Sequence, residues 1–157
     1  MKEILDVCCG SRMFYFDKKD HRVLFTDKRE ENHVLCDGRT LEVKPDIISD
    51  FTDLKFPDNT FSLVVFDPPH LKNGGDKSWI VKKYGRLSKD WQSDLSKGFN
   101  ECFRVLKPSG VLIFKWNEYQ ILVSEVLKCT DQKPIFGNKS GKQSKTHWIV
   151  FMKQESK

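Results

Sequence analysis

The sequence predicts an α/β fold built on an open, mostly parallel sheet, and three observations predict it. The 157 residues suit one domain with one core. Short apolar runs recur along the chain, each followed by a polar loop or an amphipathic segment, which is the alternation of an α/β domain. The runs are nearly continuously apolar, as strands are when a parallel sheet is buried on both faces.

Seven runs are expected to form the strands. They span residues 3–8, 22–27, 46–50, 61–67, 110–116 and 147–152, with a weaker run at 133–137. Apolar residues at helical spacing indicate two helices, over residues 88–106 and about 118–129. Ser88 is expected to cap the first helix, and Pro108 with Gly110 to end it. Little between Lys28 and Asp46 has a helical pattern, so the early helices are expected to be reduced.

The composition is that of a globular protein, with 31% charged and 38% hydrophobic residues. No apolar run approaches the roughly 18 residues of a membrane span, and the N-terminus is too soon acidic for a signal peptide. We therefore expect a cytoplasmic protein. Five cysteines without a CxxC pair indicate free thiols and no metal site. A net charge of +5 leans mildly toward polyanionic partners.

Four carboxylates fall where predicted strands end. They are Asp6, Asp27, Asp50 and Asp67. Ligands of open α/β sheets bind at the carboxyl ends of the strands, near the switch in strand order. One such acid is usually a solvated loop start, but four in succession favour a binding site at this edge of the sheet.

The segment LDVCCGS, residues 5–11, resembles the acid-x-Gly-x-Gly loop of class I S-adenosylmethionine-dependent methyltransferases. The family also has a strand that ends in an acid, then a crossover helix, then R-V-L-K-P-x-G and a further strand. The same order is found in the segments FPDNTFSLVVFDPP and FRVLKPSGVLIFKW. The resemblance implies a Rossmann-like sheet of order 3-2-1-4-5-7-6 with the last strand antiparallel, and S-adenosylmethionine as cofactor. It implies that Asp27 holds the ribose and that Asp50 and Phe51 read the adenine. The full implied cofactor set is Asp6, Cys8, Cys9, Gly10, Asp27, Asp50, Phe51 and Asp67.

The tetrapeptide Asp67-Pro68-Pro69-His70 resembles the [DNS]-P-P-[YFW] signature of methyltransferases that modify exocyclic amines of nucleic-acid bases. The resemblance implies that these four residues are catalytic. Acceptors at Asp67 and the Pro68 carbonyl would bond the amine hydrogens and turn the nitrogen lone pair toward the methyl group. By the same resemblance, the aspartate at the first position favours adenine N6 over cytosine N4 as the methyl acceptor. His70 departs from the aromatic that stacks on the base, and we leave open stacking, proton relay and a solvated loop histidine.

Residues 71–89 are expected to form a basic substrate loop beside this motif. A lid that closes only over the cofactor is the alternative. Residues 137–147 are expected to form a second basic loop. Phe14 is expected either to cover the cofactor or to pack in the core. The predicted substrate-binding residues are His70, Lys72, Trp79, Lys82, Lys83, Tyr84, Arg86, Trp116, Asn117 and Lys142.

We expect one methyltransferase domain over residues 1–153 and a frayed tail at 154–157. The predicted partner is nucleic acid, with DNA favoured over RNA and no membrane. We expect no separate target-recognition domain. The recognised site is therefore expected to be short, or the protein to form a homodimer, or the substrate to be RNA or single-stranded DNA. The chain resembles compact phage-type enzymes. Alternatives are a small-molecule or protein methyltransferase, and a non-catalytic protein that binds cofactor or nucleic acid on this scaffold.

Overall fold

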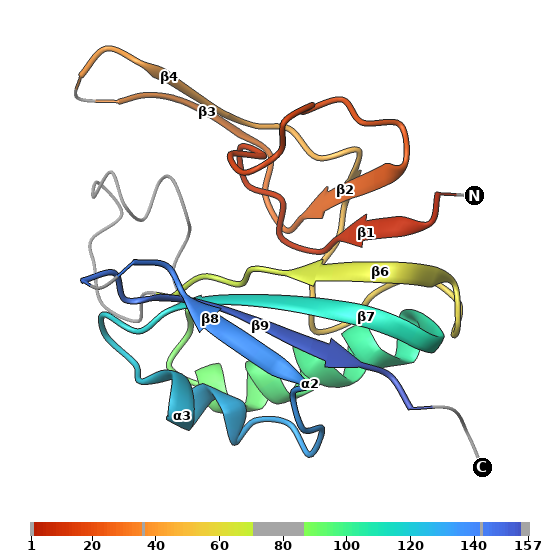
Figure 1. Cartoon of the computed structure of the whole chain (residues 1–157). Coiled ribbons are helices and arrows are strands. Elements are labelled where there is room, and N and C mark those ends of the chain that lie inside the picture. Colours follow the sequence, from red (N-terminus) through yellow and green to blue (C-terminus); the bar gives the residue numbers. More distant parts are fainter. Residues whose placement is uncertain (1, 36, 71–86, 142, 155–157) are drawn as a thin grey trace.

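A seven-stranded, mostly parallel sheet organises the chain (Figure 1). The computed structural model describes residues 2–35, 37–70, 87–141 and 143–154. The strands lie in the order β5-β2-β1-β6-β7-β9-β8, and β9 runs antiparallel to both of its neighbours. Their bounds are β1 (Ile4–Asp6), β2 (Val23–Asp27), β5 (Ile47–Ile48), β6 (Phe61–Phe66), β7 (Leu106–Asn117), β8 (Phe136–Lys139) and β9 (Thr146–Met152). The predicted Rossmann-like fold and its strand order are confirmed.

Helix α2 (Trp91–Val105) packs on one face of the sheet, below β6 and β7 in Figure 1. Its residues Leu95, Phe99 and Cys102 are fully buried at the spacing of one helix face. The Phe99 ring contacts Phe66 of β6 and Phe114 of β7 at centroid distances of 5.4 and 4.8 Å. Among the described residues, no helix has the length and apolar character of a membrane span.

The predicted helix ends need correction. Ser88 does not cap α2, which begins three residues later; its hydroxyl instead accepts from the Asp90 N–H and donates to the Asp94 carboxylate. The helix ends at Val105, and the chain passes directly into β7, so Pro108 lies within that strand.

The second helix, α3, is only Val123–Leu127, much shorter than the predicted 118–129. The Asn117 carboxamide accepts the N–H of Tyr119 at 3.0 Å, and the Glu118 carboxylate accepts that of Val123 at 3.3 Å. These side-chain bonds turn the chain before α3, because they use backbone groups that would otherwise continue a helix.

A two-stranded hairpin, which the sequence did not predict, lies between β2 and β5. It consists of β3 (Glu31–Val34) and β4 (Thr40–Val43). In β4 the side chains alternate between exposed and buried, with Leu41 and Val43 inside. The Asp37-Gly38 turn, with Gly38 at φ 85°, was the available sequence signal. The hairpin projects from the sheet on the side where the arrowheads of β1 and β6 point (Figure 1).

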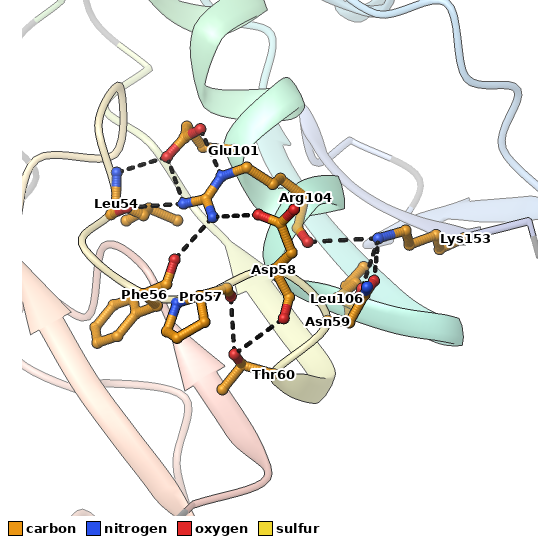
Figure 2. Close-up of polar contacts among 10 residues, drawn as sticks. All are labelled: Leu54, Phe56, Pro57, Asp58, Asn59, Thr60, Glu101, Arg104, Leu106 and Lys153. Carbon is orange, nitrogen blue, oxygen red and sulfur yellow. Dashed lines mark hydrogen bonds and ion pairs between the residues drawn. The ribbon is translucent and has the colours of Figure 1, made fainter. Parts of the chain in front are cut away.

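Arg104, at the end of α2, joins that helix to the segment that leads into β6 (Figure 2). Its guanidinium donates to the carbonyls of Leu54 and Phe56 at 2.8 and 2.7 Å. It also pairs with Glu101 on its own helix and with Asp58. These contacts fix where β6 enters the sheet, and hence where Asp67 emerges from it.

Candidate active site

A pocket of about 780 Å³ lies at the carboxyl ends of β1, β2 and β6, which is large enough for a cofactor-sized ligand. The structure brings most of the predicted site residues to its wall. Of the predicted catalytic and cofactor residues, the wall contains Cys8, Cys9, Gly10, Asp27, Phe51, Asp67, Pro68, Pro69 and His70.

The loop after β1 bends over the end of β2. Its path is fixed by the Cys9 N–H, which donates to the Thr26 carbonyl at 2.8 Å, and by the Gly10 N–H, which donates to Asp27 Oδ2 at 2.9 Å. Gly10 adopts a φ of 51°, a conformation that glycine reaches without steric cost. The one glycine retained from the acid-x-Gly-x-Gly pattern therefore lies where the turn needs it.

Asp27 ends β2 with its carboxylate in the pocket wall. Its oxygens accept N–H bonds from Gly10 and Arg29, the latter at 3.2 Å. Burial raises the pKa of Asp27, and the two N–H donors partly oppose that rise. Each carboxylate oxygen has a second lone pair, so Asp27 can still accept bonds from ligand hydroxyls.

The other side of the pocket is centred on Asp67, which follows β6. Asp67 Oδ1 lies 3.0 Å from His70 Nε2, and Oδ2 lies 3.7 Å from Lys115 Nζ. His70 is only 8% exposed and meets Trp116 edge to face, with ring centroids 5.0 Å apart. The alternative of a solvated loop histidine is therefore wrong, because the imidazole is enclosed beside the carboxylate.

Lys115 is a site residue that the sequence did not predict. It lies on β7, and its ammonium is 5.2 Å from the ring centroid of Phe14 and 5.3 Å from that of Trp148. Phe14 lines the pocket as well and stacks on Tyr15 at 4.9 Å. A lysine inside the apolar run VLIFKW was the available signal, since a charge in a buried strand needs a partner.

Asp6 was predicted to bind cofactor, but it is fully buried and lies outside the pocket wall. Burial, followed by the nearby Asp67 carboxylate, raises the pKa of Asp6 to about 8, although its contact with the Tyr15 hydroxyl opposes the shift. The buried Asp6 carboxyl is therefore mostly neutral at pH 7.

Three further predicted residues also lie off the pocket wall. Asp50 accepts the N–H and hydroxyl of Thr52 at 2.9 and 2.7 Å; burial alone would raise its pKa, but these bonds outweigh it and lower the pKa. Trp116 is fully buried and donates its indole N–H to the Ile121 carbonyl, so it does not face substrate. Asn117 donates to the Thr146 hydroxyl.

The remaining predicted substrate-binding residues lie outside the described part of the chain. They are Lys72, Trp79, Lys82, Lys83, Tyr84, Arg86 and Lys142. Within the described residues, no group of three or more His, Cys, Asp or Glu side chains could hold a metal ion.

Solved structures with the same fold include S-adenosylmethionine-dependent methyltransferases. The TehB-like enzyme from Corynebacterium glutamicum shares 15% identity over 98% of this chain and 82% of its own, with a TM-score of 0.61. The enzyme from Methanosarcina mazei shares 13% over 99% and 95%, with a TM-score of 0.58. The [4+2]-cyclase SpnF shares 12% over 98% and 74%, with a TM-score of 0.55.

No family model and no curated protein matches this sequence. The structural likenesses establish the Rossmann-like fold of class I methyltransferases, and the names of two neighbours support the cofactor that the sequence predicts. The cyclase on the same fold means that the reaction has to be argued from the site.

Proposed function

We propose that this chain is an S-adenosylmethionine-dependent methyltransferase that modifies an exocyclic amine of a nucleic-acid base, with adenine N6 in DNA as the preferred acceptor. One observation carries the proposal. Asp67-Pro68-Pro69-His70 lines the same pocket as the Gly10 loop and Asp27. The Gly10 loop, which suits a nucleoside cofactor, and the residue 67–70 motif, which suits an amine acceptor, thus line one pocket.

The cofactor side is formed by Gly10, Asp27 and Phe51. Asp27 is aimed into the pocket by the Gly10 N–H and can accept two ribose hydroxyls, while Phe51 offers a ring to an adenine. When bound, the cofactor supplies an electrophilic methyl group. The residues present fit this group, because the buried carboxylate and the loop backbone supply the polar contacts that a ribose needs.

The acceptor side is formed by Asp67 and the prolines. His70 Nε2 lies 3.0 Å from the buried Oδ1 of Asp67, and Lys115 Nζ lies 3.7 Å from Oδ2. Each carboxylate oxygen has two lone pairs, so Oδ2 can accept an amine hydrogen. Pro68 and Pro69 restrict the backbone, which holds the Pro68 carbonyl for the second hydrogen. This pair of acceptors would favour a pyramidal nitrogen whose lone pair is free to attack.

A second candidate is methyl transfer to a small-molecule amine. The observation that favours it is His70, which packs edge to face against Trp116 and is only 8% exposed. An open aromatic face for an extruded base is therefore less developed than the signature implies.

The test supplies labelled S-adenosylmethionine together with DNA, RNA and free nucleosides, and nucleoside mass spectrometry locates the label. We expect N6-methyladenine from the wild type. Asp67→Ala should lower the rate about 10²- to 10³-fold, because it removes an acceptor at the reacting group. Asp53→Ala, which removes an exposed carboxylate that lines neither this pocket nor its neighbour, is the control and should stay within about threefold of wild type. Label found only in protein or in small amines would refute the nucleic-acid assignment.

A further inference from the structure

A second hollow, of about 750 Å³, lies beside the pocket and shares Gly10, Ser11 and Met13 with it. We infer that this basic groove, lined by Arg12, Lys18, Lys19, Arg39 and Lys44, binds the phosphodiester backbone of a nucleic-acid strand whose base enters the pocket. The inference rests on the proposed function and adds to it a surface for the substrate.

The groove is basic because its cations outnumber its acids. Its acids are Glu42 and Asp46, and Asp46 is already paired with Arg12 at 3.4 Å. Arg39 is paired with Asp37 outside the groove at 2.6 Å. The three lysines, Lys18, Lys19 and Lys44, are exposed and form no ion pair within the described ranges, so against the single unpaired acid Glu42 the groove stays positive.

Arg12 fixes the positions of the two chain segments that carry the groove lysines. Its guanidinium donates to the carbonyl of Lys18 at 2.6 Å and to that of Lys44 at 2.8 Å. It also stacks over the Phe25 ring at 3.9 Å, and its side chain is only 17% exposed. One nearly enclosed arginine therefore ties together two chain segments, and each carries an unpaired lysine into the groove.

The arrangement suits a polymer better than a single phosphate. Its unpaired lysines are exposed and come from two separate chain segments, residues 18–19 and residue 44, whereas a small anion is usually held by several donors fixed around one point. The groove continues into the pocket through Gly10–Met13, and the β3–β4 hairpin, which supplies Thr40 to the groove wall, lies on the side where the parallel strands end (Figure 1). Phe14 follows this shared segment, and its ring centroid lies 5.2 Å from the ammonium of Lys115, which pairs with Asp67. A strand that leaves the groove at Met13 would therefore reach Asp67 past Phe14.

The test compares two double variants with the same change in net charge. Lys18→Glu/Lys44→Glu reverses one lysine on each of the two chain segments that line the groove, and Lys97→Glu/Lys133→Glu reverses two exposed lysines that line neither hollow. Binding of labelled single-stranded DNA and RNA is measured by fluorescence anisotropy over a range of salt concentrations. Circular dichroism melting and binding of S-adenosylhomocysteine verify that both variants keep their fold and their pocket.

We expect the groove variant to lose affinity at least about tenfold and the control to stay within about twofold. The slope of log affinity against log salt should become shallower by about 1.4, which is about 0.7 for each of two lost phosphate contacts. DNA and RNA arms show which backbone is preferred. Equal losses in both variants, an unchanged groove variant, or a wild type that binds neither polymer would overturn the inference.

The two proposals can fail separately. If the wild type binds strands through the groove but transfers no methyl group to them, the proposed reaction is wrong and the groove stands. If DNA is methylated with the same KM by the wild type and the groove variant, the reaction stands and the groove inference is wrong.

Discussion

Asp6 shows how one buried carboxyl can make stability depend on pH. It lies at the end of β1, fully buried, with Asp67 and Asp27 nearby. Its folded-state pKa of about 8 stands above the value of about 4 expected in the unfolded chain. The folded protein therefore holds a proton on Asp6 that the unfolded chain releases between these values. This contribution to stability is full below about pH 4 and is lost as the pH rises toward about 8.

We predict that the free energy of unfolding of wild type, relative to Asp6→Asn, falls with rising pH. The slope should be up to about 1.4 kcal/mol per pH unit between about pH 5 and 8, because the asparagine cannot release a proton. Above about pH 8 the difference should level off. Urea unfolding of both proteins at several pH values measures it, and parallel curves would show that Asp6 is not protonated in the folded state.

Individual site residues differed in how far the sequence could predict them. Asp27 and Asp67 could be predicted because strand ends are visible locally and meet at one edge of a parallel sheet. The Asp67–Lys115 pair could not, because it depends on β7 lying beside β6, a pairing between segments about 50 residues apart. The burial of His70 likewise depends on Trp116, which is also on β7.

Helix α2 packs against Phe51, which lines the pocket. Gly98 of α2 lies close to two phenylalanine rings. A Cβ atom added at Gly98 would be 2.6 Å from Phe51 Cδ2 and 2.7 Å from Phe66 Cζ. Phe66 is fully buried and cannot give way, whereas Phe51 lines the pocket. A glycine that looks unfavourable within a helix is thus explained by the close packing of α2 on the sheet.

We predict that Gly98→Ala lowers both stability and cofactor affinity. Alanine gains about 1 kcal/mol in helix propensity, but overpacking costs about 1–3 kcal/mol, so the net effect should be destabilising. The displaced Phe51 ring should weaken binding of S-adenosylhomocysteine in calorimetry. Ser93→Ala, on the exposed face of the same helix, is the control and should cost nothing. A more stable Gly98→Ala protein with unchanged binding would contradict this packing.

The Arg104 contacts of Figure 2 lead to a second prediction for this helix. Arg104→Ala should lower the free energy of unfolding by about 2–4 kcal/mol, because it leaves the Leu54 and Phe56 carbonyls without their charged donor. Arg22→Ala breaks an exposed pair with Asp20 and should cost less than about 1 kcal/mol. Denaturant unfolding of both variants measures the contrast, and similar losses would mean that Arg104 is only a surface ion pair.

Helix ends and the β3–β4 hairpin were the elements that sequence patterns placed least well. Ser88 has the chemistry of a cap, yet its bonds to Asp90 and Asp94 form a turn before the helix. The hairpin is short, and only one face of it is buried, so its alternating pattern is too brief to separate from a loop.

For the whole molecule, the sheet and its order followed from the strand pattern and the family resemblance, and the structure confirms both. The basic groove did not follow from the sequence, because its lysines lie on segments that only the folded chain brings together. The chain combines a pocket with two distinct sides and a groove that continues from it. We propose that this pocket holds S-adenosylmethionine on its Asp27 side and the acceptor on its Asp67 side.

Isothermal titration calorimetry with S-adenosylmethionine, on wild type, Asp27→Ala and Asp67→Asn, measures whether the two sides of the pocket have these separate roles. We expect one-to-one binding to wild type. Asp27→Ala should lose affinity about thirtyfold, which is equivalent to about 2 kcal/mol of hydrogen bonding to a charged group. Asp67→Asn should bind within about threefold of wild type. No binding by wild type, or an equal loss in both variants, would contradict the division of the pocket into a cofactor side and an acceptor side.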